Sequence, residues 1–149
     1  MKHPPFLPAR PLWTVVAACA LLAAPAFAQT AAPLYDALGA RPGLVALVDD
    51  FVDRLLVDQR MKPFFKDSDL PNLRTALVAQ FCEVSGGPCR HEGPNMKKAH
   101  DGVDITRADF NALVEVLQQS MDARSIPFGA QNRLLAKLAP MHRDIVNTP

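Results

Sequence analysis

The sequence has little excess charge of either sign, few cysteines and no long hydrophobic run. Its 149 residues include 16 Lys and Arg against 15 Asp and Glu, and no block of basic residues occurs. Because nucleic acids and anionic membranes attract proteins mainly through clustered positive charge, neither is expected as a partner. With 49% hydrophobic and 21% charged residues, the chain is also too apolar for intrinsic disorder. We expect one globular domain.

No stretch has the alternating pattern of a β-strand, and no internal repeat occurs. Apolar residues instead recur every three or four positions, the spacing of helices that bury one face. The four long segments with this spacing cover about residues 42–58 and 71–84, a segment from Thr106 to the stop at Ile126-Pro127, and a last helix from about Leu134 to Ile145 that Pro140 bends. A loop at 88–95 and a short helical turn at 96–100 lie between the second and the third. The pattern predicts an all-α fold.

The first 28 residues have the pattern of a secretory signal peptide. Lys2 and Arg10 precede an apolar run over 12–24, and residues 26–28, Ala-Phe-Ala, form a small-x-small cleavage site. A membrane anchor is the alternative, but the run is shorter than the ~20 residues that a membrane-spanning helix needs. We therefore expect cleavage after Ala28.

Removal of this segment has consequences for charge and location. The domain over 29–149 keeps 14 Lys and Arg against 15 Asp and Glu, a net charge of about −1. We expect no membrane span in the mature form and a location in the bacterial periplasm or outside the cell. A competing signal is Val16-Ala17-Ala18-Cys19, which resembles a lipoprotein cleavage box and would lead to lipidation at Cys19 instead.

Two of the three cysteines, Cys82 and Cys89, remain in the mature chain. In an exported protein an isolated pair typically forms a disulfide, and the intervening Gly86, Gly87 and Pro88 allow the chain to turn back on itself. We expect a disulfide. Two free thiols and half a metal site are the alternatives, although the spacing does not match that of a zinc knuckle.

Three histidines lie beyond residue 28, and His100 is the most informative of them. It follows Met96 by one turn on the same helical face, and Asp101-Gly102 is expected to end the turn beside a cavity. By its spacing alone, His100 is better explained as a partly buried histidine bonded to a backbone carbonyl, because a lone histidine is weak evidence for a metal site.

An ordered set of motifs is more specific. In chain order these motifs are LYDALG at 34–39, VDDF at 48–51, PFF at 63–65, GGP at 86–88, Gly93, MKKAH at 96–100, Ile105-Thr106 and Phe110. The set resembles the truncated haemoglobins, and group I in particular, over about residues 34–146. The resemblance implies a two-over-two helical sandwich that holds haem b, iron protoporphyrin IX, between its helices and binds a diatomic gas.

The resemblance also implies roles for single residues. His100 matches the proximal histidine, which binds the haem iron through Nε2 while an acceptor holds its other ring nitrogen. Phe65 matches the aromatic residue that packs flat on the porphyrin. Further haem contacts are implied at Phe51, Phe81, Met96, Ile105 and Phe110. The alternative for each of these apolar side chains is ordinary core packing.

The other two histidines are less closely tied to the motifs. His91 stands where the family usually has an aromatic residue with a polar tip near the haem edge, which implies a contact with a haem propionate. The alternative for His91 is a solvated loop histidine. His142, on the last helix, is expected at the surface because neither spacing nor motif connects it with the pocket.

The sequence departs from group I on the other side of the haem. Val52 follows Phe51 where the group usually has a tyrosine that donates a hydrogen bond to bound oxygen. The facing positions on the next helix, Leu73 and Leu77, are both apolar, whereas the group often has glutamine at the second. We therefore expect an apolar distal pocket, weak and fast-exchanging oxygen binding, and comparatively favoured carbon monoxide binding.

The function predicted from the sequence is an exported haem protein that binds O2, CO or NO, rather than a dedicated enzyme. One alternative is a haem-based redox enzyme with peroxidase or nitrite and nitric oxide chemistry, although the distal residues include no general acid or base. The other is a helical binding module that has kept the fold without haem. No pattern indicates an electron-transfer partner.

Overall fold

The computed structural model describes residues 32–148, and the predicted signal peptide, with Cys19, lies outside the described residues. All regular elements of the described part are helical. They are α1 (Leu34–Ala37), α2 (Ala40–Val57), α3 (Lys62–Phe65), α4 (Leu70–Val84), α5 (Met96–Ala99), α6 (Arg107–Ala123), α7 (Phe128–Leu138), the 3-10 turn η1 (Ala139–Met141) and α8 (His142–Ile145). The all-α prediction is confirmed.

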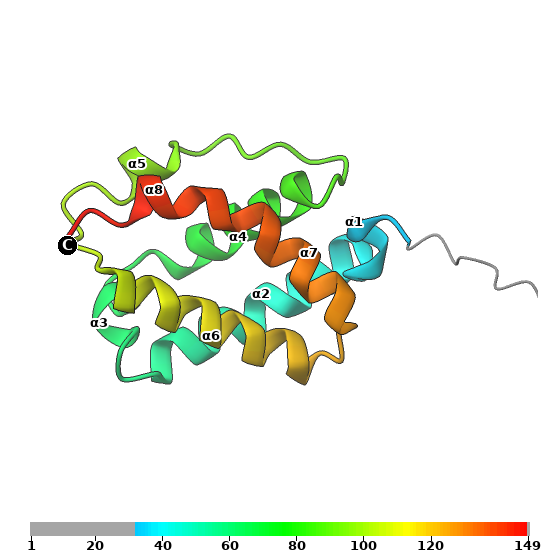
Figure 1. Ribbon diagram of the computed structural model, residues 1–149, viewed down its shortest axis with the longest axis horizontal. Coiled ribbons are helices and arrows are strands. Elements are labelled where there is room, and N and C mark those ends of the chain that lie inside the picture. The colour runs from blue at the N-terminus through cyan, green and yellow to red at the C-terminus, as the bar shows by residue number, and fades with distance from the viewer. Residues whose placement is uncertain (1–31, 149) are drawn as a thin grey trace, which may run out of the picture. The chain divides into compact units, whose positions relative to one another are not determined.

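Four long helices form two layers. The helix α2 packs against α4 and α6, while α7 packs against α4, α6 and α1. Figure 1 shows the pair α6 and α7 nearer to the viewer than α2 and α4, with the short α5 beside α8. This is the two-over-two arrangement that the resemblance implied.

Local sequence signals explain where the helices begin. The side chain of Asp69 caps α4 by accepting a hydrogen bond from the backbone N–H of Asn72 at 3.2 Å. Thr106 and Asp109 form a reciprocal capping box at the start of α6. The second helix starts at Ala40, slightly before the expected residue 42, after Gly39 with φ 83°.

The last helix differs from the expectation of a single bent helix. Pro140 has no amide hydrogen for the helical ladder, and the chain there forms the 3-10 turn η1 between α7 and α8. The helix α8 is thereby placed beside α5.

The core lies between the two layers. Its fully buried members include Leu44, Leu47, Val48, Val52, Leu55, Met61, Cys82, Val116, Met121 and Leu134. Within residues 32–148, no helix combines the length and the hydropathy required of a membrane span.

Candidate functional site

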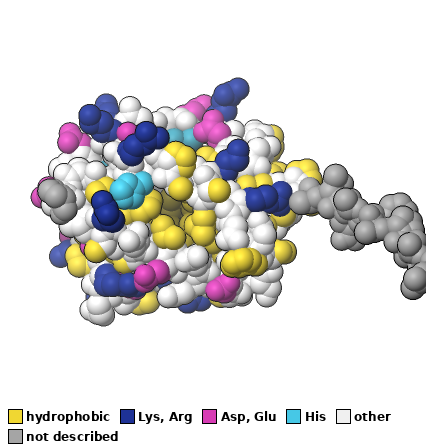
Figure 2. Space-filling view, in the orientation of Figure 1, with side chains coloured by type: hydrophobic (Ala, Val, Ile, Leu, Met, Phe, Trp, Pro, Cys, Tyr) yellow, Lys and Arg dark blue, Asp and Glu magenta, His cyan; other side chains and the backbone are white. Residues whose placement is uncertain are grey.

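A large cavity opens between the helices on one side of this core. Its volume is about 1150 Å³, and its wall is formed by α3, α4, α5, α6 and the loop at 90–94, with further side chains from α2, α7, η1 and α8. Hydrophobic side chains gather around a hollow on the face shown in Figure 2, where histidine and basic side chains lie nearby. A cavity of this size can bury most of a large apolar ligand.

Most of the side chains that the sequence assigned to a haem site lie on this wall. The assigned residues that line the cavity are Phe51, Phe65, Leu73, Leu77, Phe81, Met96, His100, Ile105 and Phe110. They come from α2, α3, α4, α5, α6 and the segment before α6, so the fold brings together residues that lie far apart in the sequence.

Val52 is the exception among the assigned wall residues. It is fully buried in the core and does not line the cavity, whereas its neighbour Phe51 and Leu55, one turn later, do. Successive residues point about 100° apart around a helix, so one broad apolar face can turn Phe51 to the cavity and Val52 to the core. The structure thus places Val52 in the core behind Phe51, and its assignment to the haem site stays a prediction.

The ring of His100 is held in a defined orientation. His100 follows α5, and its Nδ1 lies 2.7 Å from the carbonyl oxygen of Met96. A carbonyl can only accept a hydrogen bond, so this contact assigns the proton to Nδ1 and leaves the lone pair on Nε2 free. A neutral imidazole of this tautomer on a cavity wall is a suitable ligand for a metal.

The C-terminal segment supports the His100 backbone, which sequence reasoning missed. The side-chain amide of Asn147 donates to the His100 carbonyl oxygen at 3.0 Å, and its oxygen accepts from the Ile105 N–H at 2.7 Å. Asn147 thus ties the turn after α5 to the residue that precedes the α6 cap. An isolated asparagine near a terminus carries no sequence signal for such a role.

Gln80 is a second residue that sequence reasoning missed. It lines the cavity on the same face of α4 as Leu73 and Leu77, and only 9% of it is exposed. Its Nε2 lies 3.1 Å from the sulfur of Met141 and 3.5 Å from the sulfur of Met96. Thioether sulfur is a weak acceptor, so this buried amide is bonded only weakly.

His91 is half-buried on the cavity wall, which excludes the solvated loop histidine. Both of its ring nitrogens are buried and have no hydrogen-bond partner among the described residues. A Cβ added at Gly93 would lie 2.7 Å from the His91 ring, so only glycine fits at 93 with the ring in this position. An unpartnered buried imidazole is costly and indicates a missing polar partner.

The histidine expected at the surface, His142, is half-buried. Its ring stands edge-on to Phe110 at a centroid distance of 4.9 Å, and Phe110 in turn lines the cavity. His142 thus keeps part of its surface exposure and also packs against Phe110, because the helix α8 turns this ring towards α6.

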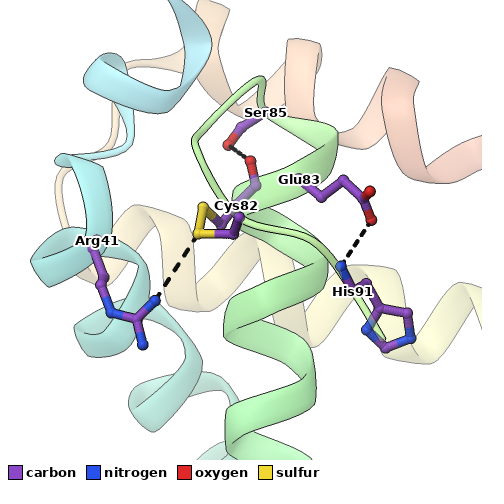
Figure 3. Close-up of a disulfide and its surroundings, with 6 residues drawn as sticks. Arg41, Cys82, Glu83, Ser85 and His91 are labelled. Atoms are coloured by element: carbon purple, nitrogen blue, oxygen red, sulfur yellow. Dashed lines mark hydrogen bonds between the residues drawn. A yellow bond between two sulfur atoms is a disulfide. The ribbon is translucent and has the colours of Figure 1, made fainter. Parts of the chain in front are cut away.

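Cys82 and Cys89 lie together behind the cavity. Their Cα atoms are 5.7 Å apart and their sulfur atoms are placed for a disulfide (Figure 3). The Ser85 hydroxyl donates to the Cys82 carbonyl oxygen at 3.0 Å, and the Arg41 guanidinium lies 3.9 Å from the sulfur of Cys89.

One carboxylate at the cavity rim is clearly perturbed. The Thr106 hydroxyl donates to Asp109 at 2.6 Å and the Thr106 N–H donates to the same oxygen at 3.0 Å. These bonds hold the pKa of the Asp109 carboxyl below its usual range. A carboxylate that stays ionised and capped in this way is suited to holding the start of α6, not to proton transfer near neutral pH.

The donor set of the cavity fits a haem. Haem is a flat, largely apolar disc with an iron atom at its centre and two propionates at one edge. The wall supplies aromatic and aliphatic surface. Within residues 32–148, Nε2 of His100 and the two buried ring nitrogens of His91 have no hydrogen-bond partner. No group of three or more histidine, cysteine or acidic residues among the described residues could hold a bare metal ion instead.

Comparisons with known proteins agree with this geometry. The family described as Bacterial-like globin matches residues 33–147. The group 1 truncated haemoglobin of Synechocystis is 30% identical over 124 residues, covering 76% of this chain and 97% of that protein. The group 1 truncated haemoglobin of Mycolicibacterium paratuberculosis is 29% identical over 114 residues, with 76% and 84% covered.

Solved structures give the same result for the fold. The truncated haemoglobin from Tetrahymena pyriformis in its Fe(III) form superimposes with a TM-score of 0.74 at 25% identity, covering 77% of this chain and 98% of that chain. The 2/2 haemoglobin from Synechococcus, solved with covalently attached haem, gives a TM-score of 0.72 at 22% identity, with 78% and 99% covered. The two-over-two fold predicted from the motifs is confirmed.

Proposed function

This chain belongs to the bacterial-like globins, among the group 1 truncated haemoglobins that bind haem b, and we propose that it is an exported protein that binds a diatomic gas at an iron coordinated by His100. The observation that carries the proposal is the hydrogen bond between Nδ1 of His100 and the Met96 carbonyl oxygen. It leaves Nε2 free on the wall of a cavity large enough for haem.

Haem, when bound, supplies an iron atom with one coordination position open to O2, CO or NO. His100 would hold the iron, and Phe65, with the other aromatic side chains of the wall, would pack against the porphyrin. His91 would donate a hydrogen bond to a propionate, because its buried ring nitrogens have no partner in the part of the chain that the structure describes. Each role uses a residue that already lines the cavity.

The gas preference follows from what α4 presents to the cavity. Leu73 and Leu77 offer no hydrogen-bond donor, and the amide of Gln80 is directed at two sulfur atoms. A donor to bound oxygen contributes about 1–3 kcal/mol, whereas carbon monoxide depends less on one. We therefore expect weak oxygen binding with fast release, and comparatively favoured carbon monoxide binding.

Absorption spectra of the chain from Gln29, supplied with haemin, test the haem site. We expect one haem per chain and a Soret band that shifts when dithionite and then carbon monoxide are added. The variant His100→Ala should lose or alter this band, whereas Lys98→Ala, an exposed change on the same helix α5, should not. A folded, helical protein without stoichiometric haem, or a His100→Ala spectrum identical to that of the wild type, would contradict the proposal.

The proposal of export is supported by the N-terminal signal-peptide pattern and by the cysteine pair Cys82 and Cys89, and it needs its own test. Expression of the full chain in a bacterium with an outer membrane, followed by mass spectrometry of the periplasmic fraction, should give a protein that begins at Gln29. It should contain a disulfide between Cys82 and Cys89. An uncleaved chain in the cytoplasm would refute export, and a lipid-modified chain that begins at Cys19 would refute cleavage after Ala28.

A further inference from the structure

The loop between α4 and α5 contributes directly to the cavity wall but has few bonds to the rest of the fold. Arg90, His91, Glu92, Gly93 and Pro94 all line the cavity. Among the described residues, no backbone–backbone hydrogen bond links residues 88–94 to another element. A segment with so few backbone bonds depends on its side chains and covalent links for a fixed position.

Two links connect this segment with α4. The carboxylate of Glu83 accepts a hydrogen bond from the backbone N–H of His91 at 3.1 Å, and Cys89, two residues earlier, is paired with Cys82. Figure 3 shows both links side by side at the end of α4. The Glu83 bond is exposed, so the sulfur link is the stronger restraint on the loop.

The cysteine pair is itself held firmly on the α4 side. Cys82 is fully buried directly after Phe81, which lines the cavity. A Cβ added at Gly87 would lie 2.5 Å from the Tyr35 ring and 2.7 Å from the sulfur of Cys82. The turn after α4 is therefore packed against this sulfur. Because Cys82 is fixed in this way, its bond to Cys89 also restrains the loop that follows Cys89.

We propose that the disulfide between Cys82 and Cys89 positions His91 in the cavity wall, so that its reduction weakens the hold of the loop on the ligand in the cavity. With the bond intact, only the short stretch after Cys89 separates the anchored chain from α5. Without it, only the exposed Glu83 bond links residues 88–94 to α4, and the His91 ring leaves its place for a larger set of conformations. The inference rests on the proposed haem site.

The redox step needs a dithiol as reductant. One thiolate of the dithiol attacks a sulfur of the pair and forms a mixed disulfide, and the other cysteine leaves as a thiolate that takes up a proton. The second thiol of the reductant then displaces the remaining cysteine. In sum, two electrons and two protons pass to Cys82 and Cys89, and the reductant becomes a disulfide.

The decisive experiment measures haem release to an excess of a haem-scavenging globin. Four samples are compared: the haem-loaded wild type and the haem-loaded His91→Ala variant, each oxidised and each treated with a dithiol. We expect reduction to speed haem release from the wild type about tenfold. This factor corresponds to the loss of one charge-assisted hydrogen bond, the bond between His91 and a propionate. In His91→Ala the oxidised protein should already release haem fast, and reduction should change the rate less than twofold.

This design separates positioning from a merely structural role. If the disulfide only stabilises the fold, reduction will accelerate release equally in both proteins, and the inference is wrong. Equal rates for the oxidised and the reduced wild type also overturn it. If neither the wild type nor His91→Ala gives a Soret band, the proposed haem binding itself has failed. That outcome is distinct from equal acceleration in both proteins and from equal rates for the oxidised and reduced wild type.

Hydrogen exchange of the protein before haem is added gives a second readout. Reduction should raise amide exchange at Gly87 and His91, whose N–H groups bond to the Cys82 carbonyl oxygen and the Glu83 carboxylate, while the amides of α2 and α6 stay protected. The double variant Cys82→Ser, Cys89→Ser should match the reduced wild type, and reoxidation of the wild type should restore protection. Unchanged exchange in this loop would refute the positioning role even if the double variant fails to fold.

Discussion

The Nδ1 atom of His100 lies 2.7 Å from the carbonyl oxygen of Met96, one helical turn earlier. The backbone on both sides of this pair is anchored as well, since Asn95 caps α5 by accepting from the Lys98 N–H at 2.9 Å and Asn147 donates to the His100 carbonyl. The ring orientation is therefore set by the protein before any ligand arrives. Such preorganisation lowers the entropic cost of coordination.

A cavity variant tests this orientation. In His100→Gly, free imidazole should restore the iron coordination that the variant lacks, because it can occupy the vacated space. Imidazole should bind about fivefold more tightly than 1-methylimidazole, since only the former can donate to the Met96 carbonyl, a bond of about 1 kcal/mol. Titrations followed by the Soret band measure both affinities. Equal affinities would show that the carbonyl does not select the N–H.

A donor added to the apolar face of α4 should slow oxygen release. Leu77 is half-buried on the cavity wall, so Leu77→Gln can be accommodated without overpacking. We expect oxygen dissociation about tenfold slower than in the wild type, with carbon monoxide release changed little. Stopped-flow measurements give both rates. The matched variant Leu77→Met has a similar shape without a donor, and a comparable slowing in that variant would point to shape rather than hydrogen bonding.

Gln80 provides a separate test of the polar content of the cavity. Replacing its amide in Gln80→Met leaves no donor or acceptor stranded, so the free energy of unfolding should stay within about 1 kcal/mol of the wild type. Gln80→Glu instead buries a carboxylate against the sulfur atoms of Met96 and Met141, and should cost about 2–3 kcal/mol at neutral pH. Urea denaturation of the haem-free protein, followed by circular dichroism, measures both. Equal stability of the two variants would mean that the side chain at 80 reaches solvent.

The sequence predicted the fold because its signals are local and agree with one another. The capping box at Thr106 and the cap at Asp69 mark helix starts, and the apolar spacing marks the buried faces. The sequence also indicates that Pro140 interrupts the regular hydrogen bonding of the last helix. Whether a proline bends a helix or divides it depends on the packing of the following residues against α5, which no local pattern contains.

The sequence was less informative about the site, for a geometric reason. Apolar periodicity places Phe51 and Val52 on the same broad helical face, and only the packing of α2 against α4 and α6 decides that Phe51 lines the cavity while Val52 lies in the core. Gln80 and Asn147 were missed because each acts on partners far away in the sequence. Polar residues of this kind look like ordinary surface residues until the fold is known.

The turn before α3 should make stability depend on pH. Two side-chain hydrogen bonds and one backbone N–H from Arg60 lower the pKa of the Asp58 carboxyl to about 2. The same carboxylate accepts from the N–H of Met61, which is buried next to the aromatic residues of α3. The pKa of the folded state is below the unfolded value of about 3.9, so this stabilisation is complete above about pH 5 and is lost as the pH falls through the folded pKa of about 2.

The variant Asp58→Asn should therefore melt at a lower temperature than the wild type at pH 7. The difference in melting temperature should be nearly constant down to about pH 5, should shrink strongly by pH 2, and should disappear below it, where the wild-type carboxyl is protonated too. Calorimetric scans of the haem-free proteins across this range measure it. Asp67→Asn is the control, because that side chain is 87% exposed. A difference for Asp58→Asn that persists unchanged at pH 2 would show that the shape of the side chain, rather than its charge, holds the turn.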